Sequence, residues 1–158
     1  MTHRQLTAEG FTIDWGIASW LVGIHIVGLA TLVAIAYGQF AMAALVIGAI
    51  WLWLSNTAIG AGYHRHFAHP THKARWPVEL FYLVFGAGSF QGPAMLWAWR
   101  HRVHHADTDK PNDPYSVARG FWWAHMGWVF HNSPYDAQRH RPADLVRSRL
   151  VVWQEKLH

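Results

Sequence analysis

The chain has 158 residues, of which 52% are hydrophobic and 15% aromatic, and its formal net charge is +4. It contains no cysteine, which excludes disulfides, thiolate zinc sites, iron–sulfur clusters and a cysteine nucleophile from these residues. Its eleven tryptophans exceed what a small soluble domain usually carries and are typical of proteins at bilayer interfaces, so a membrane protein is the leading class.

Two long uncharged stretches come first. No Asp, Glu, Lys or Arg occurs in residues 15–63, and Gly38 and Gln39 divide this region into Trp15–Tyr37 and Phe40–Tyr63. At 1.5 Å per residue, each stretch reaches roughly 35 Å as a helix, enough to cross a hydrocarbon core of about 30 Å. We therefore predict an all-α integral membrane protein, with an N-terminal segment 1–14, a transmembrane hairpin 15–63 and a helical region 64–158. Two buried helices of a soluble protein are the alternative.

The distribution of basic residues predicts the orientation of the hairpin. Arg4 precedes the first stretch, and Arg65, Lys73 and Arg75 follow the second. The positive-inside rule then places both termini and the histidine-rich region on the cytoplasmic side. His25 is the one histidine within the spans, and we expect its imidazole to bond a helix carbonyl rather than a metal.

The first histidine cluster, HRHFAH at residues 64–69, follows the second span. His64 and His69 are five positions apart, or about 140° around an ideal α-helix. They could approach two adjacent metals, or a single one if the helix bulges locally. Pro70 is expected to end this helix. His66 and His72 are expected to be solvated or to support the ligands.

Residues 80–99 are uncharged and could be mistaken for a third span. Gly86, Gly88, Gly92 and Pro93 interrupt this stretch, which weakens a continuous helix. A third crossing would also place the two histidine clusters on opposite sides of the membrane. We predict that the stretch is re-entrant or buried in the cytoplasmic region.

The second cluster reads HRVHH at residues 101–105. Its histidines are three and four positions apart, so they project from one helical face. Such imidazoles repel one another when charged and gain little from packing when neutral, and a metal ion resolves this conflict. Imidazole suits iron, zinc, copper and nickel. The predicted metal ligands are His64, His69, His101, His104 and His105.

Beyond this cluster the sequence is polar and basic. Asp107, Asp109 and Asp113 are expected in a solvated loop, with hydrogen bonds to ligand imidazoles as the alternative, and His125 is expected to be structural. Residues 134–158 favour an amphipathic helix at an anionic membrane surface. Residues 64–158 carry twelve Lys or Arg and seven Asp or Glu, an excess of +5 without a groove-reading motif, so we expect lipid rather than nucleic acid as the partner.

Three segments together resemble the front half of the membrane-bound acyl-CoA desaturases of the stearoyl-CoA type. They are GAGYHRHFAH, FQGPAMLWAWRHRVHH and GFWWAHMGW, and the similarity runs from about residue 15 to the end. The resemblance implies a di-iron centre with nine histidine ligands, five of them matched by the predicted set. It implies O₂, two electrons from a ferredoxin or b-type cytochrome, and acyl-CoA or another acyl lipid as substrate.

The same resemblance assigns three further residues. Gln91 and Trp97 match positions near the bend of the acyl tunnel, and packing alone is the alternative role for them. Arg119 matches a basic position near the coenzyme A phosphates, and an ordinary exposed arginine is equally compatible with the sequence.

The chain also departs from this family. The family continues with two further spans and a third box, H-N-x-H-H, whereas Pro134 and Tyr135 follow His131-Asn132-Ser133 here, and Tyr115 replaces a histidine. We expect an incomplete chain that is inactive alone and binds metal weakly. The alternatives are a fatty acyl hydroxylase of the same histidine-rich class and a metal- or haem-binding membrane module without turnover.

Overall fold

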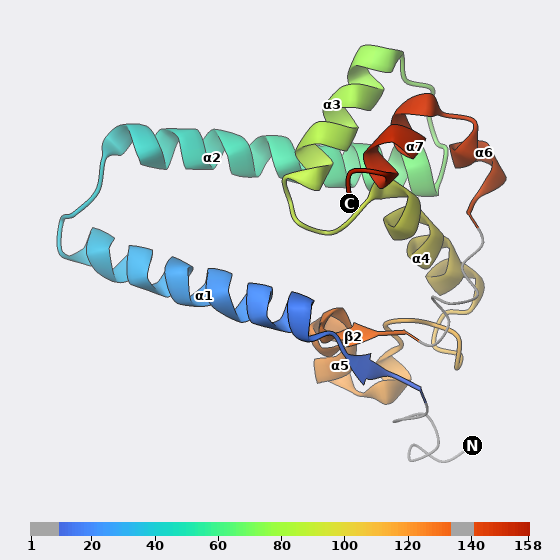
Figure 1. The fold of residues 1–158 in the computed structure, drawn as a ribbon, viewed down its shortest axis with the longest axis horizontal. Coiled ribbons are helices and arrows are strands. Elements are labelled where there is room, and N and C mark those ends of the chain that lie inside the picture. Colours follow the sequence, from blue (N-terminus) through green and yellow to red (C-terminus); the bar gives the residue numbers. More distant parts are fainter. Residues whose placement is uncertain (1–9, 134–140) are drawn as a thin grey trace. The chain divides into compact units, whose positions relative to one another are not determined.

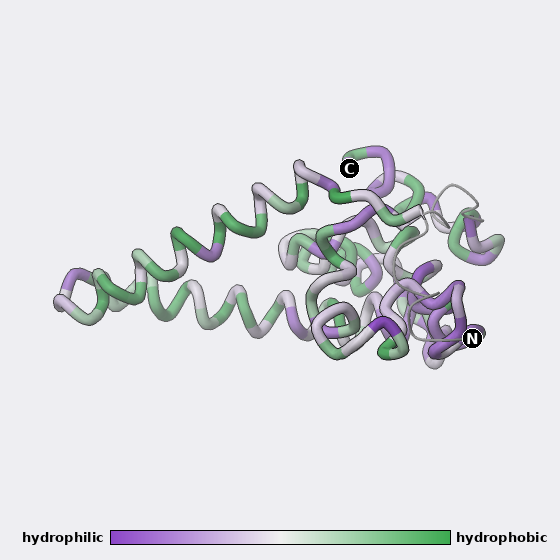
Figure 2. Tube along the Cα trace, turned by 90° about the horizontal axis from the view of Figure 1, so that it is seen from below, coloured by the Kyte–Doolittle hydropathy of each residue, from purple (hydrophilic) through white to green (hydrophobic). Residues whose placement is uncertain are grey.

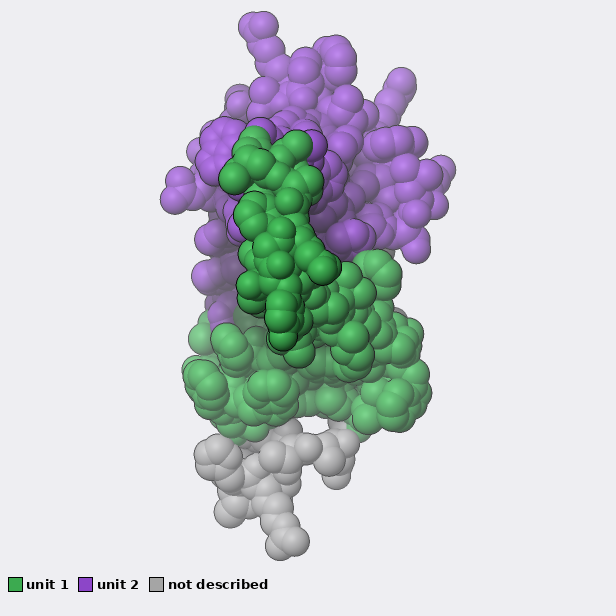
Figure 3. All heavy atoms as spheres, turned by 90° about the vertical axis from the view of Figure 1, so that its left-hand side faces the viewer, with its two compact units in different colours: residues 1–46, 107–138 green, residues 47–106, 139–158 purple. Residues whose placement is uncertain are grey.

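The computed structural model describes residues 10–133 and 141–158 (Figure 1). The chain packs as two units, which are distinguished by colour in Figure 3. Unit 1 comprises Met1–Val46 and Asp107–Gln138, and unit 2 comprises Ile47–Ala106 and Arg139–His158. The described residues are predominantly helical, as the all-α prediction requires, and each unit is considered separately below.

In unit 1, the helix α1 (Trp15–Ala36) begins at a short β-ladder. Asp14 caps the helix by accepting a hydrogen bond of 3.0 Å from the Ile17 backbone N–H. The preceding strand β1 (Thr12–Ile13) pairs antiparallel with β2 (His131–Asn132). The 3₁₀-helix η3 (Val117–Arg119), α5 (Phe121–His125) and the 3₁₀-helix η4 (Gly127–Phe130) complete the unit. The two-residue ladder was not predicted.

Two helices among the described residues are long and apolar enough to cross a membrane. They are α1, with a mean hydropathy of 2.0, and the continuous helix Met42–Ala68, with 1.7. Figure 2 shows hydrophobic residues along both. No residue of α1 is buried, so its apolar surface is available to lipid. The imidazole of His25 meets the Leu21 carbonyl at 2.7 Å, the kind of contact that we predicted.

The uncharged stretch 80–99 does not form a third spanning helix. The helix α3 (Trp76–Ala87) ends within it and α4 (Ala94–Ala106) begins near its end. The connection passes through Phe90 and Gly92, whose φ angles are 58° and 82°. This left-handed backbone breaks the helix, as the glycines and Pro93 indicate.

Unit 2 is built around the second half of the Met42–Ala68 helix. There α2 (Met42–Thr57) continues as a π-helix, η2 (Ala58–Ala68), which packs against α3 and α4. A Cβ atom added at Gly62 would lie 2.5 Å from Tyr82, and one added at Gly86 would lie 2.2 Å from the Tyr63 ring. The close approach of η2 and α3 therefore requires glycine at both positions.

The predicted surface helix over residues 134–158 is corrected by the structure. Residues 134–140 lie outside the described part of the chain, and the remainder forms two short helices, α6 (Ala143–Val146) and α7 (Arg149–Glu155). Leu145 and Val151 are buried in the core of unit 2. Burial in protein removes apolar side chains from water as lipid contact would, so the apolar pattern of this segment fits a protein core as well as a membrane surface.

Candidate metal centre

The π-helix η2 brings the first two predicted ligands together. The His69 backbone N–H donates to the His64 carbonyl at 3.0 Å, which is the i→i+5 hydrogen bond of a π-turn. Residues five apart are therefore near neighbours, and the two imidazole ring centroids are 4.9 Å apart. Both rings can bind one metal only if the helix bulges locally, and the structure contains this bulge.

The helix α4 supplies the second pair. His101 and His105 are one turn apart, and the His101 Nε2 atom lies 3.1 Å from the Nε2 atoms of both His69 and His105. His64 completes the cluster, since one ring nitrogen from each of these four histidines lies within 4.8 Å of every other. Nitrogen ligands bind first-row metals at about 2.0–2.1 Å, which allows at most roughly 4.2 Å between them. The four imidazoles need only a small contraction to hold one ion.

His104, the fifth predicted ligand, stands at the side of this cluster. Its ring centroid lies 6.2 Å from that of His101 and 5.4 Å from that of His105. It does not belong to the group of four converging nitrogens. The structure therefore divides the predicted set into four residues around one point and one residue beside them.

The surroundings favour the neutral form of two of these imidazoles, His101 and His69. Burial lowers the pKa of His101 from 6.5 to about 4, with further contributions from His64 and His105. Burial also lowers the pKa of His69, assisted by His105 and His64. Two neutral nitrogens at 3.1 Å need a proton or a cation between their lone pairs. The arrangement is chemically suited to an imidazole-binding metal ion.

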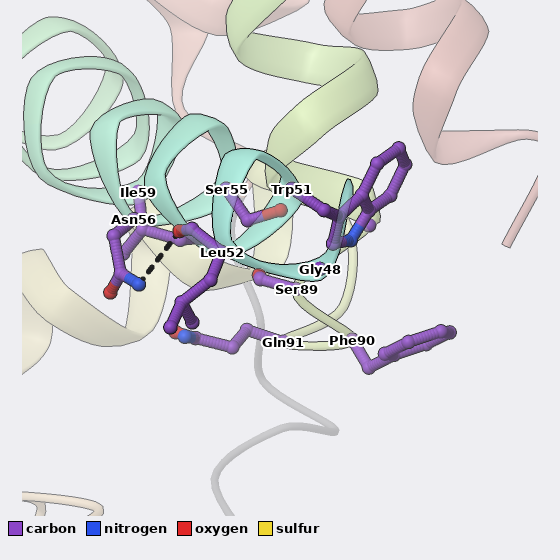
Figure 4. A pocket seen from close by; sticks show the side chains of 10 residues that line it. Gly48, Trp51, Leu52, Ser55, Asn56, Ile59, Ser89, Phe90 and Gln91 are labelled. Atoms are coloured by element: carbon purple, nitrogen blue, oxygen red, sulfur yellow. Dashed lines mark hydrogen bonds between the residues drawn. The ribbon is translucent and has the colours of Figure 1, made fainter. Parts of the chain in front are cut away.

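Gln91 and Trp97, both predicted to contact substrate, touch each other next to the cluster. The Trp97 indole N–H donates to the Gln91 side-chain oxygen at 3.0 Å, and the Trp97 ring stacks on His101 with a centroid distance of 4.9 Å. Gln91 also lines a cavity of about 450 Å³ whose wall includes Trp51 and Ser55 (Figure 4). The buried Ser55 hydroxyl has no hydrogen-bond partner among the described residues.

Arg119, the third predicted substrate residue, belongs to unit 1. Its guanidinium donates to the carbonyls of Asp113 and Pro111 at 2.8 and 2.7 Å and lies 4.6 Å from the centre of the Phe11 ring. These contacts organise the loop before η3. The structure thus shows a local role for Arg119, and its contact with coenzyme A phosphates stays a prediction.

The acidic loop in unit 1 differs from the solvated loop that we expected. Asp113 is fully buried, and its carboxylate accepts the backbone N–H groups of Asp109 and Tyr115 at 2.9 and 3.1 Å. Burial, reinforced by the charge of Asp113, raises the pKa of Tyr115 above its usual value. A buried carboxylate needs such donors, and a tight turn supplies them from nearby backbone.

The remaining histidines lie elsewhere. His66 and His72 pack against each other with ring centroids 5.0 Å apart, and the His72 ring lies near the Tyr82 hydroxyl. His125 stacks on Phe121 in unit 1, in agreement with the structural role predicted for it. None of the three belongs to the four-imidazole cluster.

The sequence analysis missed two residues that connect the histidine-bearing helices to the rest of unit 2. Arg102 donates to the Phe67 and Ala68 carbonyls at the end of η2 and pairs with Asp144. Gln154, which is buried, donates to the Tyr63 hydroxyl at 2.7 Å and accepts from the Ala94 N–H at 2.9 Å. Neither has a local sequence signal, because the partners are distant along the chain.

Comparison with known proteins identifies relatives, although no family model matches the chain. It is 36% identical over 147 residues to a probable acyl-CoA desaturase of Schizosaccharomyces pombe, covering 90% of this chain and 30% of that protein. It is 46% identical over 76 residues to acyl-CoA desaturase 1 of Saccharomyces cerevisiae, covering 48% and 15%. The sn-1 stearoyl-lipid 9-desaturase of Anabaena variabilis is 31% identical over 126 residues, covering 79% and 45%.

The chain spans less than half the length of each of these relatives. Even so, an alignment that covers 90% of the chain necessarily includes the helices that carry both histidine clusters. On the strength of these relatives, the chain belongs to the family of membrane-bound acyl-CoA desaturases.

Proposed function

We propose that the chain forms part of a fatty acyl desaturase. In this reaction two neighbouring methylene groups each lose one hydrogen and leave a cis double bond. Together with two electrons and two protons from outside, the two hydrogens reduce O₂ to two water molecules. The observation that carries the proposal is the convergence of four imidazoles from η2 and α4 within 4.8 Å, in a chain whose relatives are named desaturases.

His64, His69, His101 and His105 would hold iron through neutral ring nitrogens. Bound iron would supply the activation of O₂, which no side chain can perform alone. The compact cluster suits one ion. We assign the second iron of a di-iron centre to His104, beside the cluster, and to donors contributed by the whole protein.

Trp97 and Gln91 would direct the acyl chain past this centre. Trp97 stacks on His101, so a chain packed on the other side of its ring would lie close to the cluster. The cavity next to Gln91 combines apolar side chains such as Trp51 and Phe90 with polar ones such as Ser55, and its apolar part suits a methylene chain. Distance along the chain would then select the bond to be oxidised.

The remaining parts of the proposal concern partners and location. The substrate would be an acyl-CoA or another acyl lipid, with Arg119 near the coenzyme A phosphates. A ferredoxin or b-type cytochrome would deliver the electrons. The two spanning helices would hold the protein in a membrane, with the histidine clusters and both termini on the cytoplasmic side.

The test is expression of the natural open reading frame that carries this chain, in a host lacking its own desaturase. We expect iron in the purified protein and new cis-unsaturated fatty acids in the host lipids, with both lost in the His101→Ala variant. His125→Ala is the matched control, because that ring stacks on Phe121 in unit 1. Saturated lipids together with zinc as the sole metal would contradict the proposal. Hydroxylated acyl chains would instead identify a hydroxylase, and a Soret band a haem-binding module.

A further inference from the structure

Arg102 lies between the predicted ligands of the second histidine cluster. Its side chain nevertheless contacts the end of η2, the helix that carries the first histidine cluster. Its Nε atom donates to the Ala68 carbonyl at 3.0 Å, and its Nη2 atom donates to the Phe67 carbonyl at 2.6 Å. These carbonyls belong to the last turn of η2, immediately before His69. The last carbonyls of a helix have no partner within the helix, and here a side chain of α4 supplies the donors.

Asp144 of α6 holds the same guanidinium from another direction. Its two carboxylate oxygens accept from Nη1 and Nη2 of Arg102 at 2.9 and 2.7 Å, which is a bidentate arrangement. The hydrogen bond to Arg102 lowers the pKa of Asp144, so the pair is charged at neutral pH. One guanidinium therefore joins η2, α4 and α6.

The segment that carries Asp144 is itself anchored in unit 2. Leu145 is buried next to it, and Val151 of α7 is fully buried. Gln154 of α7 reaches the Tyr63 hydroxyl on η2, the Leu83 carbonyl on α3 and the Ala94 N–H that begins α4. Residues 141–158 thus touch each of the helices that position the histidine cluster.

We propose that Arg102 and Asp144 are positioning residues of the metal centre. They fix the last turn of η2 against α4, and so set the distance of His69 from His101 and His105, without providing a ligand. The Arg102–Asp144 pair thus acts as a clamp between η2 and α4. The C-terminal segment, whose sequence favoured a membrane-surface helix, supports this clamp. The inference rests on the proposed metal-binding role of the cluster.

The distances explain why a small displacement matters. The His69 and His101 Nε2 atoms are 3.1 Å apart, close to the separation of two ligands on one ion. The carbonyls held by Arg102 are one and two residues before His69. If they were released, the last turn of η2 could rotate and carry the His69 ring out of ligand range. Partners that orient ligands in this way typically contribute about 10–100-fold to metal affinity.

The first experiment is titration of the purified full chain in detergent with Co²⁺, whose visible absorption reports coordination. Arg102→Gln and Asp144→Asn are compared with the wild type and with Arg141→Gln. Arg141 is the matched control, because it pairs with Glu155 inside the same C-terminal segment at 2.6 Å. We expect the Kd for Co²⁺ to rise about 10–100-fold in the first two variants and to stay unchanged in the third. Arg102→Lys, which keeps the charge and loses the fork, should recover part of the affinity.

The second experiment needs no metal. Hydrogen exchange of the His69 amide, which bonds the His64 carbonyl, reports the integrity of the last turn of η2. We expect faster exchange in Arg102→Gln and Asp144→Asn and wild-type exchange in Arg141→Gln.

Unaltered Co²⁺ affinity in folded Arg102→Gln and Asp144→Asn would overturn the positioning role, as would unaltered His69 exchange. A wild-type chain that binds no Co²⁺ would instead refute the metal centre, while the exchange data would still decide whether the clamp exists. A fall in the unfolding midpoint with an unchanged Co²⁺ spectrum would reduce the pair to a stabilising contact and overturn the inference.

Discussion

The histidine-bearing helices and the C-terminal segment of unit 2 differ in how far their roles can be inferred from the sequence alone. In η2 and α4, the predicted ligands are separated by four or five residues, so local helix geometry alone places them in pairs. In residues 141–158, the important side chains have partners far away, such as Asp144 with Arg102 and Gln154 with Tyr63. The predicted ligands are therefore visible as a motif, whereas the residues that we propose to position them become visible only in the folded structure.

Removal of the central ligand should have the largest effect. His101→Ala deletes the imidazole whose Nε2 atom lies 3.1 Å from two others. We expect Co²⁺ affinity to fall by more than about 100-fold, since a ligand should matter more than its supporting residues. His72→Ala, outside the cluster, should bind Co²⁺ like the wild type. Equal losses in the two variants would contradict the assignment of ligands.

The close contact of η2 with α3 predicts a strong difference between two glycines of the same π-helix. A Cβ at Gly62 would lie 2.5 Å from Tyr82, whereas one at Gly60 meets nothing within 4 Å. Gly62→Ala should lower the free energy of unfolding by about 1–3 kcal/mol or more, because the overpacked side chains must move. Gly60→Ala should have little effect or stabilise slightly. Denaturant unfolding in detergent measures both, and similar values would contradict the packing described here.

Loss of the buried amide of Gln154 should test the C-terminal segment by itself. Gln154→Ala leaves the Tyr63 hydroxyl, the Leu83 carbonyl and the Ala94 N–H without their shared partner. The expected loss of stability is about 1–3 kcal/mol. Lys156→Ala is the control, because Lys156 is exposed and lies at the C-cap of α7. A harmless Gln154→Ala would show that the segment is not integrated into the core.

Acidification should give the most gradual effect. The pKa of His101 is about 4 in the folded apo protein and 6.5 ordinarily, so unfolding takes up a proton between these values. Stability of the apo protein should therefore fall as the pH is lowered from about 6.5 toward about 4. His101→Ala should flatten this dependence. An unfolding midpoint that is independent of pH over this range would show that the ring is not held neutral by its surroundings.

Much of the fold followed from simple patterns. The absence of charge in residues 15–63 predicted both long apolar helices, and the glycines and Pro93 predicted the break between α3 and α4. The five-residue spacing of His64 and His69 left a local bulge as one of two possibilities, and the π-helix η2 provides it. These features depend on residues within a turn or two of each other, where backbone geometry is nearly independent of the rest of the molecule.

Other features could not have been derived in this way. The pairing of β1 with β2 joins residues near positions 12 and 132, and Arg102 pairs with Asp144 across 42 positions. The burial of Leu145 and Val151 also depends on which surface covers them, because an amphipathic pattern fits lipid and protein equally well. The same limit applies to His104, whose spacing predicts the face of α4 but not its distance from η2.

X-ray absorption at the metal edge of the Co²⁺-loaded chain would test the central claim most directly. The structure predicts a shell of nitrogen donors with imidazole scattering at about 2.0–2.1 Å, supplied by His64, His69, His101 and His105. We also expect this imidazole scattering to be lost in His101→Ala. A wild-type spectrum dominated by oxygen donors, without imidazole scattering, would contradict it.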